Sequence, residues 1–293
     1  MSFFDDYKKS LKMAEAEEWL DLYVYRPVAY LFVRAIYRTS ITPNQITLFS
    51  ITVGLAAAVC FGCGPATAAV GAGLYFVCIV LDCADGQLAR LKKNGTRMGR
   101  VLDGVVDYIT GISVYFGIAV GLKPPAWPAS RWWLLMIAAA ASNIFHSIAF
   151  DYYRTRFLNV VQDTIHGEDE DYRTFADERA ALRAEKRRPV KRWAIGVYLR
   201  YLDLQTKTAV PIGAKGVDWR AHRAEFRAAN RTVLMLWSFL GSSTQITFLA
   251  AAVLLGWFPY YFWAMIVVLN IWAAVLYVVQ SRIDRRLQRK AGL

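Results

Sequence analysis

Four aspartates stand at helical spacing beside two of the most apolar segments of this sequence, where an unpaired carboxylate is costly. Asp82 and Asp85 are three residues apart, and Asp103 and Asp107 are four apart, so each pair shares one face of a helix. Buried ionised carboxylates repel one another unless cations neutralise them. Oxygen ligands of this kind favour Mg²⁺, Mn²⁺ or Ca²⁺ over zinc.

The short basic connection between the two pairs predicts that their helices are antiparallel neighbours, with all four carboxylates at one membrane depth. Such a site is able to hold two divalent ions about 3.5–4 Å apart, an arrangement suited to phosphoryl chemistry. The alternative is ion pairing with the basic residues between the pairs, Arg90, Arg97 and Arg100. Those arginines would neutralise some of the charge, but they do not explain why four carboxylates face one place. We therefore predict two Mg²⁺ or Mn²⁺ ions held by the four aspartates.

The composition of the 293 residues places these aspartates in a membrane protein. The chain is 56% hydrophobic and carries a formal net charge of +12, with a mean hydropathy of +0.27. A chain that is both apolar and basic is typical of a protein with helices in lipid and basic surfaces against anionic head groups. Nucleic acid is the competing partner of a basic protein. We expect none, because the basic residues flank apolar spans and form no separate domain.

Six segments have the length that a bilayer requires, so the predicted fold is an all-α integral membrane protein. We place the transmembrane helices at residues 43–64, 66–86, 101–122, 132–150, 233–256 and 258–280. Four regions follow: an N-terminal cytoplasmic and interfacial segment at 1–42, helices 1–4 with the aspartates at 43–150, a long cytoplasmic helical insertion at 151–231, and helices 5–6 with a basic tail at 232–293. Thr42, Pro43 and Gln45 predict a capped start for the first span.

Lysines and arginines decide the predicted orientation of the six spans. The connection after the second span, the segment 151–231 and the C-terminal tail are all basic, whereas the other connections carry little charge. Both termini and the aspartate site should therefore be cytoplasmic, in a bacterial-type inner or plasma membrane. Residues 19–38 and 190–204 are amphipathic and predict interfacial helices. For the second, packing on a soluble cytoplasmic subdomain is the alternative.

The spacing of the aspartates and the residues between them resembles the signature of a known family. Asp82-x2-Asp85-Gly86-x2-Ala89-Arg90-x8-Gly99-x3-Asp103-x3-Asp107 is similar at every fixed position to the CDP-alcohol phosphotransferases. The resemblance extends to the six-span layout and to the Pro-Asn at the start of the first span, but not to 151–231. It implies a phospholipid-synthesis enzyme that transfers a substituted phosphate from a CDP-linked alcohol to the hydroxyl of an acceptor alcohol and releases CMP.

The resemblance also implies roles for individual residues. Asp82, Asp85 and Asp103 would hold the two metal ions. Asp107 would be the general base for the acceptor hydroxyl and a further metal ligand. The nucleotide contacts would come from Asn44, Asp85, Gly86, Ala89, Arg90 and Gly99. Without the resemblance, the chemistry of Asn44 predicts only a residue of the helix cap and no contact with a ligand.

Two donor and acceptor pairs fit such an enzyme. One is CDP-diacylglycerol with a soluble alcohol such as inositol phosphate, glycerol phosphate or serine. The other is CDP-choline or CDP-ethanolamine with diacylglycerol. The compact six-span plan and the sequence DGQLAR at 85–90 favour the first pair. We assign acceptor contacts to His146, Arg154 and Arg156, against the alternatives of a packed histidine and of basic anchoring residues.

Other classes of protein also place acids in membranes. A transporter or channel usually holds them near mid-membrane on broken helices, whereas these cluster at one interface. A membrane prenyltransferase also uses Asp-rich helices with Mg²⁺, but in the form known to us it carries a second acidic motif far along the chain. The alanine run at 138–141 gives the fourth span a small-residue face, which favours a homodimer.

Overall fold

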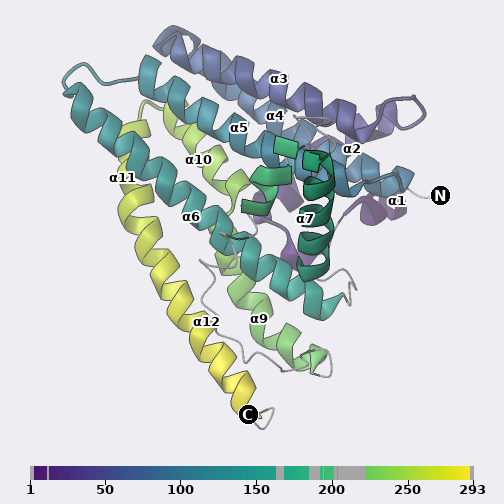
Figure 1. The fold of residues 1–293 in the computed structure, drawn as a ribbon. Coiled ribbons are helices and arrows are strands. Elements are labelled where there is room, and N and C mark those ends of the chain that lie inside the picture. The colour runs from purple at the N-terminus through teal and green to yellow at the C-terminus, as the bar shows by residue number, and fades with distance from the viewer. Residues whose placement is uncertain are drawn as a thin grey trace. The chain divides into compact units, whose positions relative to one another are not determined.

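The structure is a computed structural model that describes residues 3–11, 13–162, 168–184, 192–193, 195–200, 203, 219 and 222–290. Every regular element among these residues is helical (Figure 1). The chain divides into two compact units: residues 1–144 with 242–269, and residues 145–241 with 270–293. We call them the N-terminal unit and the C-terminal unit, after where each begins.

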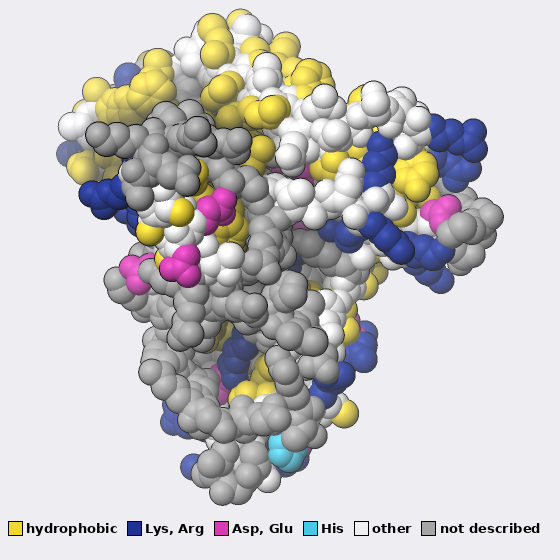
Figure 2. Space-filling model, turned by 45° about the vertical axis from the view of Figure 1, so that its right-hand side comes forward, with side chains coloured by type: hydrophobic (Ala, Val, Ile, Leu, Met, Phe, Trp, Pro, Cys, Tyr) yellow, Lys and Arg dark blue, Asp and Glu magenta, His cyan; other side chains and the backbone are white. Residues whose placement is uncertain are grey.

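Six helical stretches are long and apolar enough to cross a membrane: Pro43–Gly62, Pro65–Lys92, Val101–Gly121, Ala129–Val161, Arg223–Leu254 and Phe258–Lys290. The prediction of an all-α, multi-pass membrane protein is therefore confirmed. Large apolar side chains such as Val59, Phe116 and Leu134 stay exposed on these helices, as lipid-facing residues do. Figure 2 shows hydrophobic side chains gathered on one part of the surface, with lysines and arginines at its border.

The N-terminal unit begins with short helices that pack on a membrane-spanning helix. They are α1 (Phe3–Ser10), a 3₁₀ turn at Ala14–Ala16, a π-helical turn at Asp21–Tyr25, and α2 (Arg26–Ile36). Tyr25, Ala29 and Val33 are buried against α4 (Pro65–Lys92), while Trp19 and Tyr23 are exposed. The structure shows a helical stretch with one buried face in residues 19–38, and its place at the membrane interface stays a prediction.

Helix α3 (Pro43–Gly62) starts at the predicted cap. The backbone N–H of Gln45 donates to Thr42 Oγ1, and the N–H of Thr42 donates to Gln45 Oε1 at 2.9 Å. Pro43 occupies the first turn, where its missing N–H costs nothing. This reciprocal pair of hydrogen bonds fixes the first turn of α3, which carries Asn44 and Thr47.

Helix α3 is the common neighbour of the two aspartate helices, α4 and α5 (Arg97–Gly121). Glycines allow the close approach of α3 and α5. A Cβ on Gly117 would lie 2.2 Å from the carbonyl oxygen of Ala58, and one on Gly121 would lie 2.1 Å from that of Phe61. Within the described residues, α4 and α5 share no interface of comparable extent. The sequence therefore predicted these helices as neighbours without showing that α3 holds them both.

The connection between α4 and α5 is shorter than the sequence predicted. Helix α4 runs past the expected end at residue 86 as far as Lys92, and α5 starts at Arg97 rather than residue 101. Lys93 has a φ of 53°, the left-handed conformation that ends many helices. Thr96 caps α5 by accepting from the N–H of Gly99 at 2.9 Å. The signature residues consequently lie within helices rather than in a loop.

The remaining helices complete both units. In the N-terminal unit, the first part of α6 (Ala129–Val161), α10 (Ser242–Leu254), α11 (Phe258–Ala264) and a π-helical turn at Met265–Leu269 surround a core that includes Trp132, Leu249 and Phe262. The C-terminal unit holds the rest of α6, α7 (Glu168–Ala184), α9 (Arg223–Trp237), a 3₁₀ turn at Ser238–Leu240, and α12 (Asn270–Lys290). The fifth and sixth spans are thus each interrupted once, which their apolar sequences did not predict.

Candidate active site

Three of the four predicted aspartates converge in the N-terminal unit. Asp82 and Asp85 on α4 and Asp103 on α5 each offer a carboxylate oxygen, and these oxygens all lie within 4.8 Å of one another. Asp107 follows one turn after Asp103 on α5, and its side chain contacts that of Asp82. The Asp107 side chain is exposed. Its exposure leaves room for a reacting group beside the cluster.

The surrounding residues satisfy some of these carboxylates and leave others free to bind a cation. The hydroxyl of Thr47 on α3 donates to Asp85 Oδ2 at 2.5 Å, and both side chains are buried. Asp82 Oδ1 is also buried, but it has no hydrogen-bond partner among the described residues. A buried anionic oxygen without a partner is costly. The site consequently fits a hard divalent cation, since every donor is an oxygen.

Thr47 is a site residue that sequence reasoning missed. It lies one turn after Asn44 on α3, and its hydroxyl also donates to the Pro43 carbonyl at 3.2 Å. A threonine in the first turns of a helix is unremarkable in a sequence. Only the packing of α3 on α4 brings it to Asp85, 38 residues away along the chain.

Gly86 and Arg90 form the next part of the site on α4. A Cβ on Gly86 would lie 3.4 Å from Arg90 Nη1, so the guanidinium lies against the bare face of the glycine. Arg90 Nε donates to the carbonyl oxygen of Ser10, at the end of α1, at 2.5 Å. Ser10 is fully buried. The N-terminal helix therefore helps to orient the signature arginine, a contact across 80 residues that no local pattern predicts.

Asn44 and Gly99 meet beside this arrangement. A Cβ on Gly99 would lie 3.1 Å from Asn44 Oδ1, so the first turns of α3 and α5 approach closely where Gly99 has no side chain. Asn44 is exposed and so is accessible to a ligand. Ala89 is half-buried on α4. Its carbonyl accepts from the N–H of Asn94 at 3.2 Å, a hydrogen bond at the end of the helix.

The opposite side of α4 is anchored by buried polar contacts. Gln87 is fully buried, and its Nε2 donates to the carbonyl of Arg26 at 3.1 Å. Arg26 pairs with Glu17 at 2.6 Å. Burial lowers the pKa of Arg26, but the Glu17 carboxylate outweighs it and leaves this pKa above the ordinary value. These contacts hold the segment of α4 that presents Asp85, Gly86 and Arg90.

The three predicted acceptor residues belong to the C-terminal unit, and His146 and Arg156 contact polar side chains there. His146 is fully buried, and its Nε2 lies 2.9 Å from Asn270 Oδ1. This is the packed, hydrogen-bonded histidine of the alternative interpretation, with Asn270 joining two helices. Arg156 Nη1 donates to Asp284 Oδ2 at 2.7 Å. Arg154 is half-buried on α6. Acceptor binding by these residues stays a prediction.

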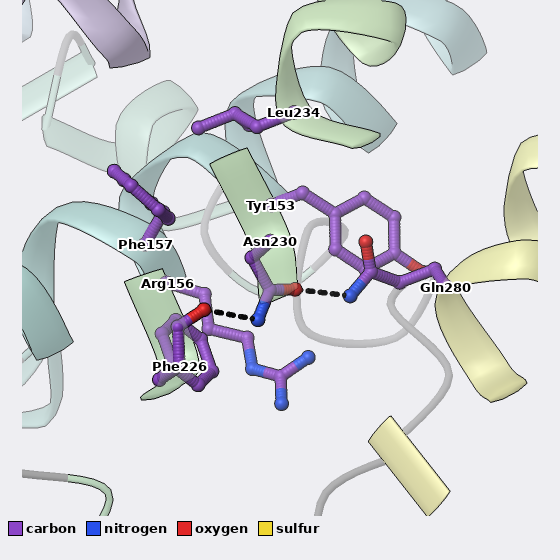
Figure 3. A pocket seen from close by; sticks show the side chains of 7 residues that line it. All are labelled: Tyr153, Arg156, Phe157, Phe226, Asn230, Leu234 and Gln280. Atoms are coloured by element: carbon purple, nitrogen blue, oxygen red, sulfur yellow. Dashed lines mark hydrogen bonds between the residues drawn. The ribbon is translucent and has the colours of Figure 1, made fainter. Parts of the chain in front are cut away.

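Figure 3 shows the surroundings of Arg156. Its guanidinium lies 5.5 Å from the centre of the Phe226 ring, which attracts a cation through its face. Asn230 bridges two neighbours: its Nδ2 donates to the Phe226 carbonyl at 2.9 Å, and its Oδ1 accepts from Gln280 Nε2 at 2.7 Å. Gln280 Nε2 also lies 3.2 Å from Asp284 Oδ1. The result is a network that joins α6, α9 and α12.

Comparison with known proteins places the aspartate site in a family. Residues 40–168 match the CDP-alcohol phosphatidyltransferase family. The chain is 29% identical over 143 residues to a phosphatidylinositol phosphate synthase of Corynebacterium glutamicum, covering 45% of this chain and 57% of that protein. It is 34% identical over 86 residues to the phosphatidylinositol phosphate synthase of Mycobacterium tuberculosis, covering 29% and 39%.

A third relative is a bifunctional IPC transferase and DIPP synthase of Aquifex aeolicus. The identity is 29% over 113 residues, which are 39% of this chain and 25% of that protein. The chain thus spans between 25% and 57% of the length of these three relatives. The family match includes all four aspartates and ends at residue 168, before most of the segment 151–231. The family that the sequence resembled is confirmed for residues 40–168.

Proposed function

We propose, on the premise that residues 40–168 form a CDP-alcohol phosphatidyltransferase domain, that this chain transfers a phosphatidyl group from CDP-diacylglycerol to an inositol phosphate and releases CMP. The observation that carries the proposal is the convergence of Asp82, Asp85 and Asp103. The acceptor class rests on the relatives, since a phosphatidylinositol phosphate is a phosphatidyl group joined to an inositol phosphate.

The proposed reaction is a displacement at phosphorus. An oxygen of the acceptor hydroxyl forms a bond to the phosphorus that carries diacylglycerol, and the bond from this phosphorus to CMP breaks. The hydroxyl proton goes to Asp107, which acts as a general base when the new P–O bond forms. The exposed Asp107 side chain beside the cluster is in a suitable place for this role.

Asp82, Asp85 and Asp103 would hold divalent metal. Two Mg²⁺ or Mn²⁺ ions would supply positive charge that neutralises the pyrophosphate and the departing CMP. Thr47 orients Asp85 by donating to one of its oxygens. The identity of the metal is part of the proposal and follows from the all-oxygen donor set.

The donor nucleotide would lie along Gly86 and Ala89. Gly86 provides a surface without a side chain, and Arg90 presents a planar guanidinium to phosphate oxygens from a fixed position. Asn44 and Gly99 would bound the nucleotide at the first turns of α3 and α5. Within the proposal, the carbonyl of Ser10 holds the guanidinium in place.

The test is CMP release by the purified full chain with Mg²⁺ or Mn²⁺. CDP-diacylglycerol with an inositol phosphate should release CMP, and Asp107→Asn should abolish release. Asp177→Asn is a matched control. Asp177 is exposed on α7, so this substitution makes the same chemical change outside the site. CMP release only from CDP-choline or CDP-ethanolamine with diacylglycerol would instead favour the other donor class. Metal-independent release, or release unaffected by Asp107→Asn, would overturn the mechanism.

The sidedness of the site is also a proposal. We infer that the aspartate ends of α4 and α5 face the cytoplasm, because the connection 91–100 and the end of α12 are basic. Cys63 is exposed at the opposite end of α3, and Cys78 and Cys83 are buried. An impermeant maleimide should therefore label Cys63 in intact cells, and labelling only after cell lysis would reverse the orientation.

We infer a homodimer from the small-residue face of α6. Ala138 and Ala141 are exposed within the alanine run. The mass of the purified chain, measured by light scattering with the detergent contribution subtracted, should be that of two chains, and a mass of one chain would exclude the dimer.

A further inference from the structure

The segment after the family match forms a small helical layer of its own. Helix α7 packs on the helical residues 195–200, where the rings of Phe175 and Tyr198 meet edge to face at 5.4 Å. Phe175, Ile195 and Leu199 are all buried. This bears on the predicted interfacial helix at 190–204, part of which lies outside the described residues. Its described part packs on α7, whereas Trp193 is 55% exposed.

Between these two helical pieces lies a cavity of about 580 Å³ with a basic lining. The described residues that line it are Ala176, Arg179, Ala180, Arg183, Arg192 and Leu199. We call it the arginine groove. It belongs to the C-terminal unit and contains none of the residues assigned to the proposed reaction.

The three arginines of the groove lack acidic partners among the described residues. The ion pairs of this part of the chain join other residues, such as Arg156 with Asp284 and Lys290 with Glu225. Arg179 and Arg183 are one helical turn apart, so their charges repel each other. Three guanidinium groups at one cavity therefore favour binding of an anion that neutralises them.

A glycine leaves room for one of these guanidinium groups. A Cβ on Gly196 would lie 2.9 Å from Arg179 Nη2, so the guanidinium lies against the bare backbone of this glycine. Ala176 and Ala180 occupy the groove side of α7 with methyl groups only. Small residues at these positions keep the cavity open beside the arginines.

We propose that the arginine groove binds the phosphate of an anionic phospholipid head group. Guanidinium groups match phosphate oxygens with paired hydrogen bonds, which favours phosphate over a monoatomic anion. Arg192 is followed by the exposed Trp193, and tryptophan beside arginine is typical of the membrane interface. An anionic leaflet supplies such head groups at high local concentration to a chain of net charge +12.

The experiment measures lipid binding to the purified full chain by native mass spectrometry in a neutral detergent. Phosphatidylglycerol is the probe, and phosphatidylcholine is the zwitterionic comparison. The variant Arg179→Gln/Arg183→Gln/Arg192→Gln removes the three charges of the groove. The matched control, Arg282→Gln/Arg285→Gln/Arg289→Gln, removes three exposed arginines of α12 that do not line it.

The groove variant should bind phosphatidylglycerol about tenfold more weakly, because charge-assisted contacts to phosphate are lost. The control should bind it as the unmodified chain does, and phosphatidylcholine binding should not change. An equal loss in both variants would mean a general charge effect and would overturn the proposal. Displacement of the lipid by an equal concentration of inorganic phosphate would overturn the assignment to a lipid.

A second measurement does not depend on the variants. Amide hydrogen exchange of the unmodified chain should slow in α7 when phosphatidylglycerol is added and should not slow with phosphatidylcholine. Unchanged exchange in α7 with both lipids would overturn the proposal. Neither measurement requires turnover, so the outcome is independent of whether the proposed transferase reaction is found.

Discussion

The N-terminal and C-terminal units each bury acidic side chains among membrane-spanning helices, but they treat the charge differently. Asp284 in the C-terminal unit is 1% exposed and pairs with Arg156 at 2.7 Å. In the N-terminal unit, Asp82, Asp85 and Asp103 come together, and Asp82 Oδ1 has no partner among the described residues. In the first arrangement Arg156 neutralises the carboxylate, although its own Nη2 has no hydrogen-bond partner among the described residues, whereas in the second a buried carboxylate oxygen is left for a cation to bind.

This difference separates a structural charge from a functional one more clearly than burial does. Buried ionisable residues in membranes are expensive and are often functional. Here the free-energy cost of burying Asp284 is offset by contacts with Arg156 and Gln280. The ring of Phe226 also faces the Arg156 guanidinium. Thr47 offsets only part of the cost of burying the aspartate cluster, and the unpartnered Asp82 Oδ1 is consistent with a site that binds a cation.

Asp82→Asn is expected to have the largest effect on activity. The amide cannot supply the anionic oxygen that a divalent ion needs, so CMP release should fall by about 100-fold or more. In the presence of a chelator, however, this variant should melt at or above the temperature of the unmodified chain, because the repulsion among the clustered carboxylates has been reduced. Melting is followed in detergent by circular dichroism at 222 nm. A variant that is inactive because it melts much earlier would contradict a catalytic role.

Asp284→Asn makes the same chemical change at the paired site and should have the opposite effect on stability. It leaves the largely buried Arg156 guanidinium without its anion, at a cost of about 3–5 kcal/mol, because removing one partner of a buried ion pair leaves an uncompensated charge. Arg156→Leu/Asp284→Leu removes both charges and should recover most of the lost melting temperature. Equal destabilisation by the single and double variants would mean that the charges do not depend on each other. Loss of activity by the double variant at unchanged stability would instead favour the acceptor role of Arg156.

The sequence predicted the aspartate cluster of the N-terminal unit much better than the Arg156–Asp284 pair of the C-terminal unit, for a physical reason. Helical periodicity places Asp82 with Asp85 and Asp103 with Asp107, because each pair lies within one turn of one helix. The cap at Thr42 was also predictable, since its hydrogen bonds join residues three apart. Both features depend on local geometry that a sequence specifies directly.

Contacts between distant segments were beyond such reasoning. Arg156 and Asp284 are 128 residues apart, and Thr47 and Asp85 are 38 apart. Their partners follow from which helices pack together, and the common neighbour α3 is selected by glycines at the interface rather than by any polar pattern. The sequence reveals Arg156 as a basic residue near a span but not that Asp284 neutralises it, and its acceptor role stays a prediction.

Glu18 offers a third kind of buried carboxylate, in the N-terminal unit, and the smallest expected effect. Its Oε2 accepts from the N–H and the hydroxyl of Thr244 at 2.8 and 2.9 Å, with no cationic side chain in these contacts. Burial and the nearby Asp21 raise the pKa of Glu18 from 4.5 to about 8. The folded state therefore binds this proton more tightly than the unfolded chain does.

The sign of the resulting pH dependence follows from that difference. The stabilisation from protonated Glu18 is fully present below a pH of about 4.5 and is lost as the pH rises towards about 8. The melting temperature of the unmodified chain should therefore fall over this range relative to that of Glu18→Gln, whose neutral amide still offers an acceptor oxygen to Thr244. Parallel melting curves for the two proteins would mean that backbone and hydroxyl donors stabilise the ionised carboxylate fully. In that case hydrogen bonds would stabilise the Glu18 carboxylate as fully as Arg156 stabilises that of Asp284. A buried acid would then count as paired whether its partner is a cation or a set of hydrogen-bond donors.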